Sequence, residues 1–213
     1  MFIPYPKMKT LFKLEQKENS KNWTITKGEI LPETAALHFL PKEDLVFTEK
    51  IDGTNMGLYV ENGKLIHIQK RSKIANPEDK SDQFYFEPGL IPETFPEEFT
   101  GVIFGELHGT KIQKGGIYSN EREFRMFDIL NVVGNKFFTW DAVLAFSEKL
   151  QIPTVPEVEY NGGLTMEEVR DFIVSQKVWC NSDAQAEGMV VRYRKDVSVD
   201  KRWVAKIRHS DFR

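Results

Sequence analysis

The feature that most limits the fold is a run of short, strand-like segments separated by tight-turn signals in residues 45–68. Apolar and β-branched residues dominate positions 45–48 and 56–60, and the pairs Asp52-Gly53 and Asn62-Gly63 interrupt them. Asp-Gly and Asn-Gly are the pairs that two-residue hairpin turns prefer. The stretch is therefore predicted to be an antiparallel meander of three strands, with Lys50 at the corner after the first.

The rest of the chain adds further strands and two helices to this meander. Strands are predicted at residues 23–26, 101–109, 124–130, 188–193 and 203–208. Thr139 is a predicted N-cap for a helix that continues to about Leu150, and Thr165 with Glu168 forms a capping box for a second helix. The polar residues 15–22 and the proline-rich residues 76–99 are predicted loops, and the second has room for one short helix. This mixture indicates an α+β fold of antiparallel β-sheets with flanking helices.

Length and composition favour a single domain. The chain has 213 residues, of which 40% are hydrophobic and 29% are charged, as in ordinary soluble proteins. No apolar run is long enough to span a bilayer and no signal peptide is visible, so we expect a cytoplasmic protein. The single cysteine, Cys180, excludes an intramolecular disulfide, and we expect a small buried side chain there.

The charge is unevenly distributed along the chain. A formal net charge of -3 argues against a general nucleic-acid coat. Residues 192–213 are nevertheless locally basic, whereas residues 78–106 are acidic and are predicted to form a solvated face. The basic C-terminal strands, with Lys111 and Lys114, are expected to follow a nucleic-acid backbone.

Lys50 is the candidate nucleophile, because a lysine at the end of a strand is held rigidly in front of a turn. The pattern Lys-x-Asp-Gly-x-Asn in residues 50–55 resembles motif I of the covalent nucleotidyltransferases, which include ATP-dependent DNA and RNA ligases and mRNA capping enzymes. Five further segments follow in the order that this superfamily requires. They resemble motifs Ia (Arg71-Ser72), III (residues 104–109), IIIa (residues 127–129), IV (residues 187–190) and V (residues 206–208).

The closest resemblance is to the RNA ligase 2-like family of ATP-dependent RNA ligases. Glu49 before the lysine, Gly-Thr-Asn after it and Ile112-Gln113-Lys114-Gly115 after motif III are similar to that family, from about Lys42 to the C-terminus. The resemblance implies the nucleotidyltransferase architecture, that is, an ATP-grasp-like ligase adenylation domain. Such ligases usually continue beyond motif V. We expect residues 1–213 to be a single adenylyltransferase domain with no C-terminal accessory domain, either sufficient alone, excised, or completed by a partner in trans.

The resemblance further implies an ATP-dependent RNA ligase. Lys50 takes AMP from ATP, AMP moves to a 5'-phosphate end, and a 3'-hydroxyl then displaces AMP to seal RNA. A nicked duplex and an RNA/DNA hybrid are candidate forms of the substrate. A lysine amine with its ordinary pKa of about 10.4 is protonated at neutral pH, and neighbouring cations favour the neutral amine that attacks phosphorus. A Mg²⁺ or Mn²⁺ ion is expected with ATP.

Each site residue has an implied role. Lys206 and Arg208 would bind phosphate, and Arg71 would bind phosphate or ribose. Glu106 would bind the ribose hydroxyls, and Phe127 would stack on adenine. Glu49 would accept a hydrogen bond from the exocyclic amine of adenine, Ile51 would adjoin the nucleotide, and Asn55 would orient an oxygen. Asp52 and Glu187 would hold the metal through water.

Three other functions fit the same residues. A DNA ligase catalytic domain would prefer DNA ends, and a capping-type guanylyltransferase would attach GMP to Lys50. A nucleotide-binding module without turnover would bind ATP reversibly and form no adduct. Incubation with labelled nucleotide distinguishes these possibilities.

Overall fold

The computed structural model describes residues 1–17 and 21–213, and the chain divides into two compact units. Unit 1 consists of Met1–Pro6, Asp52–Val155 and Lys195–Asp200. Unit 2 consists of Lys7–Ile51, Pro156–Arg194 and Lys201–Arg213. The chain therefore passes from unit 2 to unit 1 directly after the sequence Lys50-Ile51. The expectation of one adenylyltransferase domain over residues 1–213 stays a prediction.

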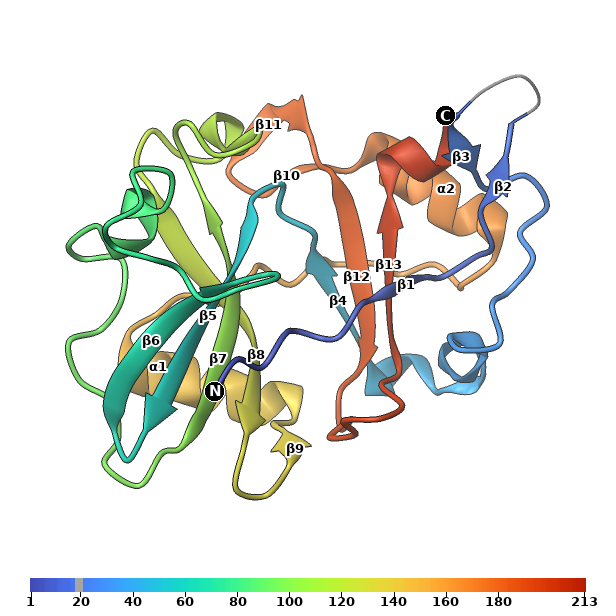
Figure 1. The fold of residues 1–213 in the computed structure, drawn as a ribbon. Helices are drawn as coiled ribbons and strands as arrows, with labels where there is room; N and C mark the ends of the chain where they lie inside the picture. The colour runs from blue at the N-terminus through green and yellow to red at the C-terminus, as the bar shows by residue number, and fades with distance from the viewer. Residues whose placement is uncertain (18–20) are drawn as a thin grey trace. The chain divides into compact units, whose positions relative to one another are not determined.

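Unit 1 is built on a five-stranded antiparallel sheet with the strand order β6-β5-β7-β8-β9 (Figure 1). Its strands are β5 (Thr54–Glu61), β6 (Lys64–Lys70), β7 (Gly101–His108), β8 (Glu123–Asn131) and β9 (Lys136–Phe137). Short 3₁₀ helices, η3 (Gln83–Phe86) and η4 (Gly115–Ile117), lie in the loops before β7 and β8. The strands predicted at residues 56–60, 101–109 and 124–130 are confirmed.

The two turn predictions had different outcomes. Asn62 and Gly63 join β5 to β6 with φ values of 47° and 72°, as a type I′ hairpin requires. The prediction of a hairpin at Asp52-Gly53 was wrong. The strand before it, β4 (Leu45–Glu49), pairs with β12 (Gly188–Tyr193) in unit 2 and not with β5. All five residues of β4 are buried in that position. Burial of a whole strand outweighs the local preference for a tight turn.

Helix α1 (Trp140–Leu150) contacts β8 and begins at the predicted cap. The hydroxyl oxygen of Thr139 accepts a hydrogen bond from the Ala142 amide at 3.3 Å, which satisfies one of the unpaired amides at the helix start. Trp140 and Val143 are buried. A separate apolar cluster of unit 1 consists of Tyr59, Val102, Phe104, Leu130 and Phe137, with Tyr5 and Phe127 packed against it.

Unit 2 is built on a four-stranded sheet with the order β1-β13-β12-β4. β1 (Lys9–Thr10) runs parallel to β13 (Val204–Arg208), and the other pairs are antiparallel. Helix α2 (Met166–Ser175) supplies Val169 and Ile173 to a core that includes Phe47, Met189 and Ile207 from the sheet. The Thr165 hydroxyl oxygen accepts from the Glu168 amide at 3.3 Å, so the predicted N-cap of the second helix is confirmed.

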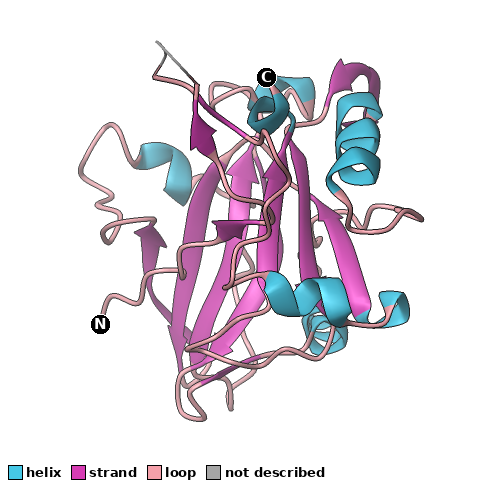
Figure 2. Ribbon diagram, turned by 90° about the vertical axis from the view of Figure 1, so that its right-hand side faces the viewer, coloured by secondary structure: helices cyan, strands magenta, loops and turns pink. Residues whose placement is uncertain are grey.

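The remaining elements of unit 2 are short. They are β2 (Glu15–Gln16), β3 (Trp23–Thr24), η1 (Ala35–Phe39), η2 (Lys42–Asp44), β10 (Lys177–Val178), β11 (Asn181–Gln185) and η5 (His209–Phe212). Strands make up more of the regular structure than helices (Figure 2). The α+β class with antiparallel sheets and flanking helices is therefore confirmed. No helix in the described ranges is long and apolar enough to cross a membrane.

Three local predictions were wrong. The predicted loop at residues 15–22 begins with β2, which pairs with β3, while residues 18–20 lie outside the described residues. Cys180 is exposed, because it lies in the turn between β10 and β11. The acidic residues 78–106 are not uniformly solvated: Asp82 is 2% exposed and its carboxylate lies 2.5 Å from the Lys70 amine. A buried acid is tolerated inside the unit when it forms an ion pair with a neighbouring lysine, and a pattern of charge alone does not reveal such a pair.

Candidate active site

Lys50 lies at the point where β4 ends in unit 2. Its backbone amide donates a hydrogen bond to the Gly188 carbonyl at 2.9 Å, which extends the β4–β12 pairing one residue beyond Glu49 and Met189. The backbone of Lys50 is thus fixed by a buried sheet. A lysine that attacks a bound substrate needs this kind of rigid support.

The amine of Lys50 pairs with the carboxylate of Glu187. Nζ lies 2.5 Å from Oε2, and the two side chains are 25% and 24% exposed. Glu187 is held in turn through its backbone carbonyl, which accepts from the His209 amide at 2.8 Å. The predicted nucleophile and the predicted motif IV acid are therefore brought together, 137 residues apart in the sequence.

Two predicted phosphate ligands lie on the same sheet. Lys206 pairs with Val190, and Arg208 pairs with Gly188. Their neighbours Ala205 and Ile207 belong to the core of unit 2, and alternate residues of a strand point to opposite faces. Lys206 and Arg208 therefore project from the face opposite the core.

Gly188 occupies the position between Lys50 and Arg208 in the sheet. A Cβ atom built on Gly188 would lie 2.8 Å from the Arg208 Cα atom, and the φ angle of Gly188 is +155°. A side chain at this position would disturb the pairing of β12 with β13. With glycine at position 188, no side chain separates Lys50 from Arg208 across the sheet.

The guanidinium of Arg208 is oriented by Asp211. Its Nε and Nη2 atoms donate to Asp211 Oδ1 at 3.0 and 2.7 Å, and the Arg208 amide donates to Oδ2 at 2.8 Å. Asp211 is 1% exposed. Sequence reasoning missed this residue as part of the site. The Arg-x-x-Asp spacing would have suggested it only with the knowledge that a 3₁₀ turn follows β13.

Glu49 is 3% exposed, and its Oε2 atom accepts a hydrogen bond from the Trp179 amide at 2.9 Å. Trp179 lies in the turn between β10 and β11, and sequence reasoning also missed this contact because it involves only the tryptophan backbone. Ile51 is 2% exposed. Unit 2 thus contains six of the predicted site residues. They are Glu49, Lys50, Ile51, Glu187, Lys206 and Arg208.

Unit 1 contains the other five predicted residues. They are Asp52, Asn55, Arg71, Glu106 and Phe127. Asn55 of β5 is paired with Glu106 of β7, so the two side chains are neighbours on one face of the sheet. Arg71 is exposed and directly follows the end of β6. Asp52 is partly buried at the start of unit 1.

Phe127 lies at a bulge in β8. Phe104 pairs with Asp128 and Gly105 pairs with Met126, which leaves Phe127 as the extra residue. Bulges redirect a side chain relative to the regular pleat. The Phe127 ring packs edge-on against Tyr5, with 5.0 Å between ring centroids, and the Tyr5 hydroxyl donates to Asp128 at 2.8 Å. The aromatic ring predicted to contact adenine is therefore partly buried and supported from the N-terminal segment.

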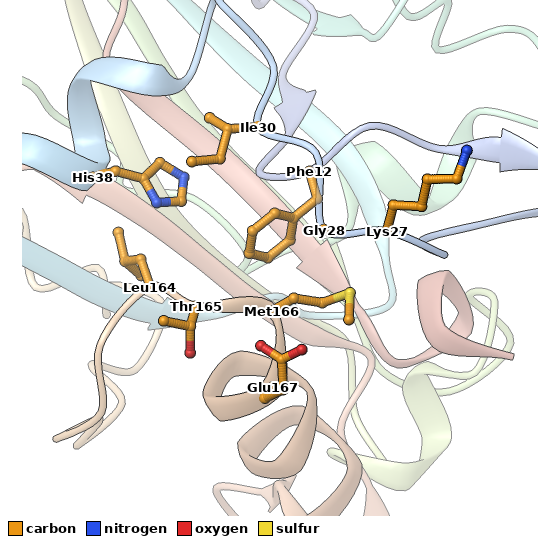
Figure 3. Close-up of a pocket in the computed structure, with 9 residues that line it drawn as sticks. All are labelled: Phe12, Lys27, Gly28, Ile30, His38, Leu164, Thr165, Met166 and Glu167. Carbon is orange, nitrogen blue, oxygen red and sulfur yellow. The ribbon is translucent and has the colours of Figure 1, made fainter.

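A pocket in unit 2 lies apart from the predicted residues. Phe12, Gly28, Ile30, His38 and the first turn of α2 line it (Figure 3). Burial lowers the pKa of His38, which keeps its imidazole neutral at physiological pH. None of the eleven predicted site residues lines this pocket.

The carboxylates suit a hydrated magnesium ion better than a dedicated metal cage. No group of three or more His, Cys, Asp or Glu side chains within residues 1–17 and 21–213 is arranged to hold a metal. Mg²⁺ usually retains several waters and uses one or two carboxylates together with substrate phosphates. Glu187 in unit 2 and Asp52 in unit 1 are each partly exposed, and a carboxylate that is open to water suits that mode of binding.

The comparison with protein families decides the classification. A model of the RNA ligase family matches residues 43–208, which include all eleven predicted site residues. The chain belongs to the RNA ligase family. No curated protein matches this RNA ligase family member.

Solved structures of Naegleria gruberi RNA ligase share its fold. A mutant with ATP and Mn is 15% identical, with a TM-score of 0.59 over 99% of this chain and 64% of that chain. A mutant with AMP and Mn is 16% identical, with a TM-score of 0.61 over 95% and 61%. The form with PPi is 17% identical, with a TM-score of 0.57 over 96% and 61%. The predicted nucleotidyltransferase architecture is confirmed, and this chain spans less than two thirds of those chains.

Proposed function

We propose that this RNA ligase family member is an ATP-dependent polynucleotide ligase that seals RNA and carries AMP on Lys50. The observation that supports this most directly is the 2.5 Å pair between Lys50 and Glu187, on a sheet that also carries Lys206 and Arg208. A single lysine placed among an acid and two cations has the composition of a nucleotidyl-transfer site.

In the first step, the lone pair of the Lys50 amine attacks the α-phosphorus of ATP. A nitrogen–phosphorus bond forms, the bond to the bridging oxygen breaks, and pyrophosphate leaves. The Lys50 ammonium first gives up one proton to solvent, which frees the nitrogen lone pair for attack and ends the ion pair with Glu187. Lys206 and Arg208 bind the α-phosphate and stabilise its developing charge.

The base and sugar of ATP are bound by the remaining predicted residues. Phe127 stacks on adenine, Glu106 binds the ribose hydroxyls, and Glu49 accepts from the exocyclic amine. A carboxylate acceptor favours adenine, which offers an amino group there, over guanine, which offers a carbonyl. Arg71 binds phosphate or ribose, Ile51 adjoins the nucleotide, and Asn55 orients a substrate oxygen.

ATP and a divalent cation are the expected cofactors. The related Naegleria gruberi structures hold ATP with Mn or AMP with Mn, which supports the same pair of ligands here. Mg²⁺ or Mn²⁺ held by Glu187 and Asp52 through water would neutralise charge on the transferred phosphoryl group.

The second and third steps join two polynucleotide ends. The 5'-phosphate end displaces Lys50 from AMP, and a 3'-hydroxyl then displaces AMP to form the phosphodiester. RNA is the proposed substrate because the family model is that of RNA ligases. Lys111 and Lys114 are both exposed and are suited to following a sugar-phosphate backbone.

Incubation with α-labelled ATP and magnesium tests the proposal. Wild type should gain one adenylate by mass, Lys50→Ala should gain none, and Lys42→Ala, which removes another exposed lysine of unit 2, should label normally. Reversible ATP binding without an adduct would indicate a binding module, and labelling by GTP alone would indicate a capping-type enzyme. Matched RNA and DNA nicks, single strands and pre-adenylylated ends then identify the substrate, and sealing of DNA only would indicate a DNA ligase.

A further inference from the structure

Two tyrosine hydroxyls contact the segment that follows the proposed nucleophile. The backbone amide of Asp52 donates a hydrogen bond to the Tyr118 hydroxyl at 3.1 Å. The Tyr85 hydroxyl lies 3.1 Å from Thr54 Oγ1, within hydrogen-bonding distance. Both contacts lie entirely within unit 1, and they fall on either side of Gly53.

The two tyrosines are buried and reach this segment from different loops. Tyr85 is 3% exposed and Tyr118 is 8% exposed. Burial raises the pKa of Tyr85, so its hydroxyl stays protonated and is able to donate. The Tyr118 ring packs edge-on against His108 at the end of β7, with 5.5 Å between centroids. Each hydroxyl is therefore held by its own part of the core.

The loop that carries Tyr85 is anchored by Asp82. This carboxylate lies 2.5 Å from the Lys70 amine and accepts from the Asn76 amide at 3.0 Å. Lys70 is the last residue of β6 and immediately precedes Arg71. The position of Tyr85 is thus tied to the strand that ends at a proposed phosphate ligand.

Gly53 fixes the same segment from a third direction. A Cβ atom at this position would lie 2.5 Å from the Leu107 carbonyl oxygen and 2.9 Å from Glu106 Cγ. The turn therefore lies directly against the end of β7. With its backbone against β7 and a hydroxyl on each side, the segment has little freedom to shift.

We propose that Tyr85 and Tyr118 are positioning residues that hold residues 52–54 so that Asp52 and Asn55 face the metal–nucleotide complex in a fixed orientation. This inference rests on the proposed function. A buried hydroxyl that only filled space would be replaceable by hydrogen, whereas a positioning hydroxyl is not. Loss of a positioning hydroxyl lowers the rate of adenylate transfer at saturating ATP, whereas loss of a hydroxyl that only fills space leaves that rate unchanged.

The test uses Tyr85→Phe and Tyr118→Phe, which keep the rings and remove only the hydroxyls. Tyr160→Phe is the matched control. Tyr160 is a buried tyrosine of unit 2, and its hydroxyl donates to the Gly163 carbonyl at 2.5 Å. Single-turnover formation of Lys50-AMP is measured with the full chain at varied ATP and magnesium. Melting temperatures are measured in parallel.

Each of the two Phe variants should lower the saturating rate about fivefold, the factor expected from losing one hydrogen bond. The ATP concentration for half-saturation should stay within about twofold, and the magnesium concentration for half-saturation should rise. Tyr160→Phe should lose similar stability and keep its rate. In a double-mutant cycle, Thr54→Val with Tyr85→Phe should be no slower than either single variant.

An unchanged rate in both Phe variants, with adduct formed normally by wild type, would overturn the positioning role and leave the proposed function intact. Equal slowing by Tyr160→Phe would overturn it as well, since the effect would then follow stability. Absence of an adduct in wild type would overturn both proposals.

Discussion

The amine of Lys50 lies 2.5 Å from Oε2 of Glu187, and these are the first residues of the predicted motifs I and IV. Their pairing orients the amine on a rigid strand end, but it also engages the nitrogen that attacks phosphorus in the proposed mechanism. The proposed mechanism therefore requires Glu187 to release Lys50 and to take the divalent cation as its partner when the nucleotide binds. This exchange gives the acid a role that a neutral side chain of the same shape cannot fill.

Replacing Glu187 by Gln should lower the rate of Lys50-AMP formation by at least about 100-fold, the usual scale for losing a preorganised charged group. Labelling with α-labelled ATP provides the measurement. Glu157→Gln, which changes a more exposed carboxylate of unit 2 that lies 4.0 Å from Arg194, is the control and should react normally. Normal labelling of the Glu187 variant would contradict its assigned role.

Lys206→Ala should abolish the adduct. The substitution removes the positive charge that is proposed to bind the α-phosphate, from the sheet face that also carries Arg208. The matched control is Lys201→Ala, an exposed lysine of the same C-terminal segment. Adduct yield after a fixed incubation is the readout. If Lys206→Ala labels as fast as Lys201→Ala, Lys206 does not bind the reacting phosphate.

Gly53→Ala should destabilise the fold by about 1–3 kcal/mol, the cost of overpacking, because its Cβ would clash with the Leu107 carbonyl. It should also lower adenylate transfer, since the clash displaces Asp52. Gly116→Ala is the control, because a Cβ there has nothing within 4 Å. Denaturant unfolding compares the two variants, and equal stability would show that the 52–54 turn tolerates a side chain.

Asp211→Ala should destabilise unit 2 by about 2 kcal/mol, because it leaves Arg208 without its oriented carboxylate while the arginine side chain keeps partial access to water. For a chain of this length the melting temperature should fall by about 4–8 °C. Asp171→Ala removes an exposed pair with Arg170 and should change the melting temperature little. Similar melting temperatures for both variants would show that the Arg208–Asp211 pair adds no stability.

Stability should fall in acid through His108. Burial of this 0% exposed imidazole lowers its pKa from 6.5 to about 4, with Glu123 opposing and Arg125 adding to the effect. Between these values the unfolded chain binds a proton that the native state does not, so the contribution of His108 to stability is present above pH 6.5 and is lost as pH falls towards 4. The loss should approach about 3 kcal/mol.

Unfolding by urea at pH 7 and pH 4.5 measures this dependence. His108→Gln removes the titrating group, so its free energy of unfolding should fall less between pH 7 and pH 4.5 than that of the wild type. Identical losses in the two proteins would mean that other groups account for the acid sensitivity.

The sequence by itself determined most of the longer strands, the helix caps and the candidate residues. Thr139 and Thr165 cap their helices as predicted because capping depends on residues within one turn, and the Asn62-Gly63 hairpin formed because its left-handed dihedrals are a local property. The candidate roles of Lys50, Glu106 and Glu187 were likewise available without a structure, because their segments resemble motifs I, III and IV of the nucleotidyltransferases in the same order.

The tertiary structure alone decided which strands pair and which side chains meet. Turn chemistry at Asp52-Gly53 predicted a hairpin, but β4 joined β12 because that pairing buries the whole strand. The contacts of the Trp179 amide with Glu49 and of the Tyr118 hydroxyl with Asp52 left no local signal. Such contacts join segments distant in sequence, and their formation depends on the burial free energy of the whole unit and not on the preferences of neighbouring residues.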